Sequence, residues 1–184
     1  HMKDGYYEDI LSLLSSSINP IFMGSLEATE DLKLEVSFMQ DIIAKLTAKD
    51  DKYACAIADK IISESQDTDK WYEFFDAFAS LLNHPKSLVR NRVLYILSAN
   101  AQWDDENRFD AIISDYLSHV TDDKPITARQ CIKALAQVGV AKPQYIPRIL
   151  SCFQEADLSK YKDSMRPLIE RDMTETKKAL IEQL

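Results

Sequence analysis

Apolar residues recur at intervals of three and four along almost the whole chain beyond residue 36. This spacing places them on one face of an α-helix, whereas a half-buried strand would alternate apolar and polar positions. No sustained alternating run of β-branched residues occurs. The pattern therefore predicts an all-α protein built from amphipathic helices.

One apolar stripe repeats along the chain at a nearly constant interval. Phe38, Ile42 and Leu46 define it at four-residue steps. It returns at Phe74, Phe78 and Leu82, at Phe109, Ile113 and Leu117, and at Tyr145, Ile149 and Phe153. A second helix follows each copy, with its register repeated at Ile57, Val93, Ile132 and Leu168. A fixed period of about 20–50 residues is typical of helical repeat arrays.

The repeat predicts four helical hairpins, at about residues 30–66, 69–101, 105–139 and 143–172. Pro85, Pro125 and Pro143 stand where helices are expected to begin, because the first turn of a helix leaves its N–H groups unpaired and tolerates proline. Asp104 and Asp105 precede a further predicted helix and can cap it. A helix at about 4–16 and an apolar loop at 18–24 come before the hairpins, and a final helical segment begins at Met173.

The stretch from Leu81 to Leu94 resembles the HEAT repeat. That family places Asp-Pro after the first helix of each hairpin and Val-Arg early in the second. Here His84-Pro85 and Val89-Arg90 occupy these places, and Asp123, Pro125 and Arg129 give a second copy of the pattern. The first and last copies lack the arginine, so the resemblance covers about 37–172 and is most specific over 69–139.

The resemblance implies an armadillo-type α-α superhelix, a solenoid of about four HEAT-like hairpins. Residues 1–36 would form an N-terminal capping helix and loop, residues 37–172 the repeat array, and residues 173–184 a C-terminal capping helix. The N-terminal region would either fold over the first hairpin or contact a partner. The resemblance also implies a structural ladder in which Arg90 and Arg129 bind aspartates such as Asp123 through planar guanidinium groups.

Composition agrees with one folded array and excludes several classes of protein. Apolar residues make up 46% of the 184 residues and glycine occurs only 3 times, which is not the composition of a disordered chain. No apolar run approaches the about 18 residues that span a bilayer. Three cysteines are too few for a disulfide framework, which favours a reducing, cytoplasmic setting. The initial His1-Met2 resembles the remnant of an expression tag.

Charge opposes nucleic-acid binding but is unevenly distributed. The net charge of −8 lacks the surplus of lysine and arginine that phosphate contacts need. Residues 124–171, however, contain 9 lysines and arginines against 4 acidic residues. This basic stretch is either a solvated face paired with acidic neighbours or a patch that binds an acidic segment of a partner protein.

The candidate binding residues lie on the second helices of the hairpins, which line the concave side of a HEAT array. They are Asn91, Arg129, Gln130, Lys133 and Arg166. Trp103, in a polar loop, either packs over the hairpin ends or anchors a partner. The chain lacks nucleophile motifs, phosphate-binding glycine loops and metal-ligand spacings, so we expect no cofactor and no bound metal.

These features predict a non-enzymatic scaffold or adaptor that binds a protein partner on its concave face. The alternative is a nucleic-acid-acting protein that resembles the HEAT-like alkylpurine DNA glycosylases. In that family Trp, Asp and Arg surround the damaged base, and only Trp103, Asp104 and Arg129 match this set here. The acidic net charge favours the scaffold.

Overall fold

The computed structural model describes residues 26–183, and over this range the chain is helical with no strand. The predicted all-α class is therefore confirmed. The chain divides into two compact units, residues 1–45 and residues 46–184.

The first unit contains most of helix α2 (Leu26–Leu46). The helix predicted at 4–16 and the apolar loop at 18–24 lie outside the described residues. Helix α2 is continuous through residues 36 and 37, where the sequence predicted the start of the array. Of the first apolar stripe, Phe38 is 49% exposed, because burial begins only in the second half of α2 with Met39, Ile42 and Ile43.

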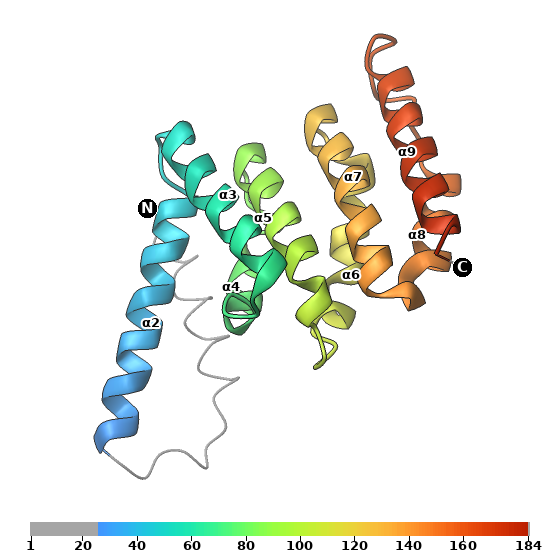
Figure 1. Cartoon of the computed structure of the whole chain (residues 1–184). Helices are drawn as coiled ribbons and strands as arrows, with labels where there is room; N and C mark the ends of the chain where they lie inside the picture. Colours follow the sequence, from blue (N-terminus) through green and yellow to red (C-terminus); the bar gives the residue numbers. More distant parts are fainter. Residues whose placement is uncertain (1–25, 184) are drawn as a thin grey trace. The chain divides into compact units, whose positions relative to one another are not determined.

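The second unit has two layers of helices. Four long helices lie side by side, each packed on the next: α3 (Asp51–Asp67), α5 (Ser87–Asn100), α7 (Pro125–Ala141) and α9 (Arg166–Ile181) (Figure 1). We call them the long-helix layer. The short helices α4 (Phe75–Ser80), α6 (Phe109–Ser118) and α8 (Ile146–Glu155) alternate with them along the chain.

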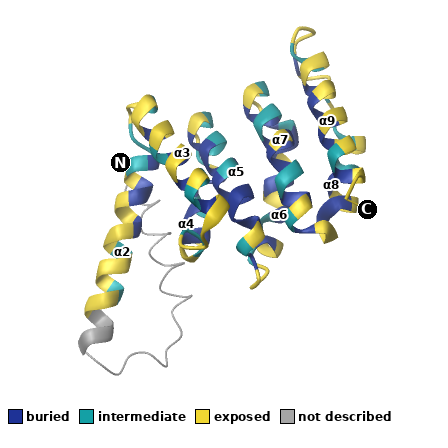
Figure 2. Ribbon diagram, viewed as in Figure 1, coloured by how far each residue is buried: buried dark blue, intermediate teal, exposed yellow. Residues whose placement is uncertain are grey.

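Aromatic side chains join successive short helices. The ring of Phe109 lies 5.6 Å from that of Phe75 and 6.0 Å from that of Tyr145, which ends the 3-10 turn before α8. Phe109 and Phe75 are fully buried, and Figure 2 shows the buried positions (dark blue) running along α5 and α7. The predicted stripes at 74–82 and 109–117 are buried as expected, because residues four apart share one helix face.

The register predicted for the long helices agrees with burial at Val93 of α5 and Ile132 of α7, which are both fully buried, and fails in α9. In α9, Ile169 is buried and the predicted Leu168 is 37% exposed. The connection from α8 to α9, residues 156–165, is longer than the turns that precede α3, α5 and α7. Helix α9 also runs on to Ile181, so the separate C-terminal helix predicted from Met173 is wrong.

The buried carboxylate of Asp104 caps the N-terminal end of α6, as the sequence predicted. Asp104 is 2% exposed and accepts hydrogen bonds from the backbone N–H groups of Arg108 and Phe109, at 2.7 and 3.1 Å. The Tyr72 hydroxyl donates to it at 2.6 Å and the Lys142 ammonium lies 3.1 Å away. Burial and the neighbouring Asp104 raise the pKa of Tyr72, so the phenol stays a donor. One carboxylate thus caps α6 and connects three successive segments.

A second buried carboxylate, Asp122, lies in the turn before α7. The Arg90 guanidinium holds both of its oxygens, at 2.9 and 2.7 Å, and His119 Nδ1 lies 2.7 Å from Oδ2. The Lys124 N–H donates to it at 2.9 Å. Burial alone would raise the pKa of Asp122, but the hydrogen bonds from His119, Arg90 and Lys124 outweigh burial and hold this pKa well below its ordinary value.

The predicted arginine ladder has acidic partners other than Asp123. Asp123, the expected acid, is 94% exposed and lies 3.3 Å from Lys160, while its neighbour Asp122 binds Arg90. Arg129 binds Asp172 of α9, a residue within a helix and not in a turn. The Asp123 assignment is therefore corrected to Asp122 and Asp172.

Candidate functional site

A groove of about 440 Å³ opens between α3 and α5, with the edge of α7 at one side. From α3 the lining residues are Asp51, Lys52, Cys55, Ala58, Asp59 and Ile62. From α5 they are Leu88, Asn91, Arg92 and Tyr95, and α7 adds Gln130. The groove therefore lies on one face of the long-helix layer and involves three consecutive helices.

Two small residues of α3, Cys55 and Ala58, line the groove together with the larger Asn91 and Tyr95 of α5. The Tyr95 hydroxyl donates a short hydrogen bond to Gln130 Oε1, which connects α5 to α7 at the edge of the groove. Burial raises the pKa of Tyr95, which keeps this hydroxyl protonated.

Polar side chains connect three of the long helices near their C-terminal ends. Gln137 of α7 donates from Nε2 to Gln66 Oε1 of α3 at 3.2 Å, although α5 lies between these helices. Ser98 of α5 donates to Gln137 Oε1 at 3.4 Å.

An ion pair holds one end of the groove. Arg92 is 6% exposed and donates to the backbone carbonyl of Leu46 at 3.0 Å and to Asp51 Oδ1 at 2.9 Å. Lys86 also donates to Asp51 Oδ1, at 2.6 Å. Hydrogen bonds from Lys86 and Arg92 lower the pKa of Asp51. Because the two cations already bind this carboxylate, it contributes little free charge to the groove.

Two of the five predicted binding residues line the groove. Asn91 and Gln130 both face it, and the side-chain oxygen of Asn91 is buried without a hydrogen-bond partner among the described residues. The amide oxygen of Gln130 accepts a hydrogen bond from the Tyr95 hydroxyl. The structure thus brings together these two residues, which come from different hairpins.

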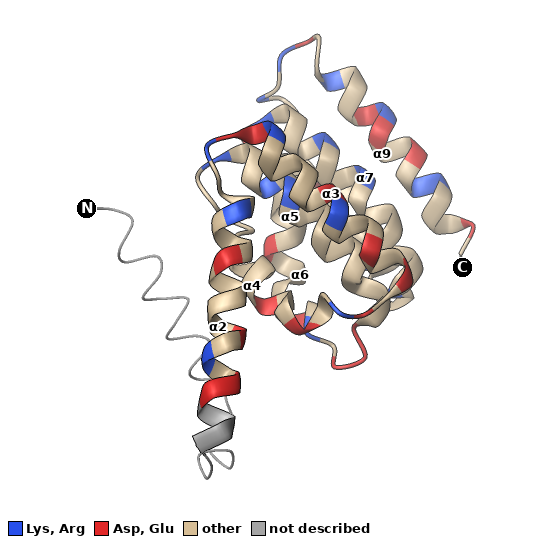
Figure 3. Ribbon diagram, turned by 60° about the vertical axis from the view of Figure 1, so that its left-hand side comes forward, with Lys and Arg blue, Asp and Glu red and all other residues tan. Residues whose placement is uncertain are grey.

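The three predicted basic residues lie elsewhere. Arg129 and Lys133 face Asp172, which is 3% exposed, with Lys133 Nζ at 3.7 Å from Oδ1. The hydrogen bond to Asp172 raises the pKa of Arg129. Arg166, at the start of α9, pairs with the exposed Asp163. Acidic and basic positions are interspersed along α9 (Figure 3), so part of the basic stretch is neutralised by pairing.

Trp103 packs within the fold. Its indole N–H donates to the Ser65 carbonyl at 2.8 Å, and Gln102 donates to the same carbonyl at 2.8 Å. These contacts satisfy a backbone oxygen near the C-terminal end of α3. Asp104 caps α6 and Arg129 binds Asp172, so each residue of the set that resembles a glycosylase site has a partner inside the fold.

Sequence reasoning missed Tyr95, Leu88 and the small residues of α3. Leu88 is 41% exposed although its spacing in the sequence is that of a core leucine. The alanine and cysteine of the stretch 54–58 were the one available signal, because small residues on a helix face often mark close approach or a hollow.

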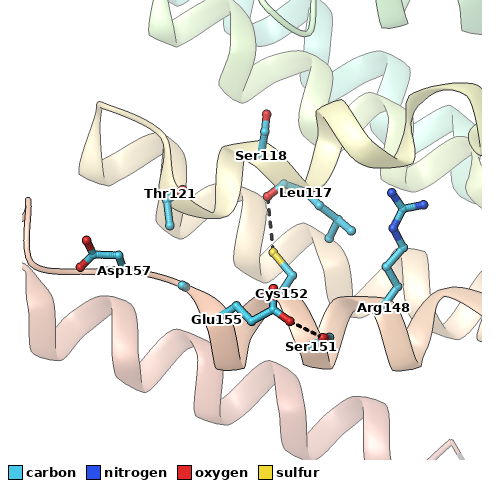
Figure 4. Close-up of a pocket in the computed structure, with 9 residues that line it drawn as sticks. Leu117, Ser118, Thr121, Arg148, Ser151, Cys152, Glu155 and Asp157 are labelled. Carbon is cyan, nitrogen blue, oxygen red and sulfur yellow. Dashed lines mark hydrogen bonds between the residues drawn. The ribbon is translucent and has the colours of Figure 1, made fainter.

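A second hollow, of about 380 Å³, lies between α6 and α8. Cys152 points from α8 toward Leu117, and its Sγ donates to the Leu117 carbonyl at 3.7 Å (Figure 4). Burial raises the pKa of the Cys152 thiol, which disfavours the nucleophilic thiolate. Ser151 donates to Glu155 at 2.8 Å, so its hydroxyl is directed at a carboxylate within its own helix. This hollow has no activated nucleophile.

The described residues contain no group of three or more His, Cys, Asp or Glu side chains arranged to hold a metal ion. They also contain no helix long and apolar enough to cross a bilayer.

No family model, no curated protein and no solved structure matches this chain.

Proposed function

We propose that this chain is a non-enzymatic scaffold or adaptor, a HEAT-like α-solenoid that binds a partner protein on the concave face of its long-helix layer. The groove between α3 and α5 is the observation that carries the proposal. It combines exposed apolar surface at Leu88 with polar groups of Asn91 and Gln130, and binding sites in proteins commonly have this mixture.

Recurrent contacts support the repeat architecture. Hydrogen bonds connect Asn100 to Ser65, Tyr95 to Gln130, Tyr145 to Asp110 and Cys152 to Leu117, and each spans 35 residues. Contacts at one constant separation near the predicted period are expected where neighbouring units of an array pack on each other.

We also predict that an acidic segment of the partner binds the part of the long-helix layer formed by α7 and α9. Lys133 is the best candidate there, since its side chain is 46% exposed and lies 3.7 Å from Asp172. The proposal also includes a cytoplasmic location, which three free cysteines, one of them exposed, support.

The experiment is a pull-down in which three forms of the full chain serve as bait: wild type, Leu88→Glu and Val140→Glu. Both variants replace a half-exposed apolar residue with an acid, 41% and 52% exposed, but only Leu88 lines the groove. We expect a protein that is retained by wild type and Val140→Glu and lost by Leu88→Glu. Circular dichroism of the three forms serves to check that each variant is folded.

Equal recovery of every partner by Leu88→Glu and wild type would contradict binding at this face. Recovery of nucleic acid alone, released by salt, would contradict the scaffold and favour the alternative class. A Lys133→Glu variant tests the acidic segment separately, because loss of the partner there locates an anionic contact on α7.

A further inference from the structure

Exposed apolar residues recur in the first turn of three consecutive long helices. Leu88 and Ile126 are the second residues of α5 and α7, and Leu168 is the third residue of α9. They are 41%, 50% and 37% exposed. Single exposed apolar residues are common on protein surfaces, but a set at equivalent positions of adjacent helices is typical of an interaction surface. We call these three residues the apolar row.

The apolar row lies on the face of the long-helix layer that holds the groove. Leu88 lines the groove, and so does Gln130, which lies one turn from Ile126 on the same face of α7. Leu168 lies one turn before Asp172, whose carboxylate binds a side chain of α7. Because α7 packs between α5 and α9, the row crosses three neighbouring helices near their N-terminal ends (Figure 1).

The spacing of the apolar row fits a helix that lies across the layer. Packed helices are about 8–10 Å apart, so the row has one apolar residue at each such step. An α-helix presents the same face every seven residues, which is about 10.5 Å along its axis. An extended strand presents the same face about every 6.6 Å and falls out of step with the row. About 15 residues of a partner helix therefore cover all three positions.

Two cations share one carboxylate beside the α7 and α9 part of the row. Arg129 and Lys133 of α7 both bind or face Asp172 of α9. The side chain of Asp172 is 3% exposed and that of Lys133 is 46% exposed, so the carboxylate is covered while the ammonium is open to solvent. This cluster therefore gives the face one positive charge more than it has carboxylates.

The α5 end of the row has the same arrangement. Lys86 and Arg92 both bind Asp51 Oδ1, at 2.6 and 2.9 Å. Further charges near the row come with one of opposite sign: Lys52 and Asp59 in the groove, and the ion pairs Arg166–Asp163 and Arg171–Glu175. The two clusters with a surplus cation therefore decide the local sign, and they are complementary to carboxylates of a partner.

We propose that the apolar row receives an amphipathic α-helix of the partner protein, which lies across α5, α7 and α9 and has a heptad-spaced apolar stripe flanked by glutamate or aspartate. Its apolar side chains cover Leu88, Ile126 and Leu168. Its carboxylates meet Lys86 and Lys133, the more exposed lysines of the two clusters. This inference rests on the proposed function and names the segment of the partner that binds.

The probe is the fluorescein-labelled peptide acetyl-(LAELEAE)3, three heptads with one leucine stripe flanked by glutamates. Fluorescence anisotropy measures its binding to the full chain. A companion peptide, acetyl-(LAKLKAK)3, reverses the charge, and a second has proline in place of one central alanine, which breaks the helix. We expect the acidic helix to bind, more weakly as salt is added, and each companion to bind at least about tenfold more weakly.

Ile126→Ser and Val140→Ser are the matched variants. Both residues are half-exposed on the same face of α7, at 50% and 52%, but only Ile126 belongs to the apolar row. Ile126→Ser should weaken binding of the acidic peptide about fivefold, because the peptide then covers one apolar side chain fewer. Val140→Ser should leave this binding unchanged.

Equal binding of the acidic peptide by Ile126→Ser and wild type would overturn the inference. No binding, or equal binding of the basic or the proline peptide, would also overturn it. If wild type sediments as a dimer and Ile126→Ser as a monomer, a second copy of the chain covers the row and the partner helix is wrong. If one of these results occurs while Leu88→Glu still loses the natural partner, the inference fails and the scaffold stands.

Discussion

Arg90 of α5 holds both carboxylate oxygens of Asp122, which lies 32 residues further along the chain in the turn before α7. The two side chains are 11% and 4% exposed, so the pair is largely removed from water. Arg90 also donates to the backbone carbonyls of His84 and Pro85, at 2.8 and 3.2 Å. The pair therefore joins two consecutive turns between short and long helices.

Removing the charge of Asp122 should destabilise the fold strongly. Asp122→Asn leaves the guanidinium of Arg90 without its carboxylate, and breaking one side of a buried pair costs about 3 kcal/mol. We expect a loss of about this size in the free energy of unfolding measured with urea. Asp123→Asn is the control, because Asp123 is 94% exposed and pairs only with Lys160, so its loss should stay within about 0.5 kcal/mol. Equal effects at the two positions would contradict the assignment.

The same carboxylate should make stability depend on pH in acid. The pKa of Asp122 is lower in the folded chain than in the unfolded chain, where an aspartate has a pKa of about 3.9. Its stabilising contribution is complete above that unfolded value and is lost as pH falls toward the folded value. Urea unfolding below about pH 5 should therefore show a steeper loss of stability in wild type than in Asp122→Asn. If the free energy of unfolding falls equally with pH in the two proteins, another group causes the loss of stability in acid.

Arg129 should matter for folding more than Arg166 does, although both were predicted to bind a partner. Arg129→Ala leaves the buried Asp172 with only Lys133 at 3.7 Å, and we expect a cost of about 3 kcal/mol. Arg166 pairs with Asp163, which is 95% exposed, so Arg166→Ala should change stability by less than about 0.5 kcal/mol. Thermal unfolding of the two variants distinguishes them, and a larger loss for Arg166→Ala would refute the structural role of Arg129.

Asn91→Leu should stabilise the free protein. It replaces a side chain whose amide oxygen is buried and unpaired with an apolar side chain of similar size, and removing such an oxygen gains about 1 kcal/mol. Asn100→Leu is the contrast, because the Asn100 amide donates to Ser65 Oγ and to the Ile96 carbonyl, at 3.0 and 2.9 Å. Loss of these two hydrogen bonds should destabilise the protein. Chemical denaturation of both variants measures the difference in sign. A destabilised Asn91→Leu would mean that Asn91 stabilises the fold.

Local features of the chain were predictable because they depend on contacts within a few residues. Phe109 and Ile113 share a helix face through the period of the helix, and both are buried. Asp104 caps α6, because it can reach the N–H groups four and five residues ahead. Pro125 begins α7, because the first helical position needs no donor.

The candidate site was predictable only in part. Asn91 and Gln130 were chosen from their helix positions, and both line the groove. The hollow itself depends on what α3 places opposite α5, and a sequence pattern does not tell which apolar residues meet across two helices. For the same reason Leu88 could not be distinguished from a core leucine, although it is 41% exposed.

The sequence by itself determined that this chain forms amphipathic helices with a repeated apolar stripe, because helical periodicity and end capping are local. Only the tertiary structure decided which charges meet. Asp122 and Asp123 are chemically identical neighbours, yet Asp122 is buried and bound by Arg90, whereas Asp123 is exposed to water. Arg129 of α7 meets Asp172 of α9, which lies 43 residues further along the chain. These pairs depend on the relative rotation and displacement of helices, which packing sets across the whole unit.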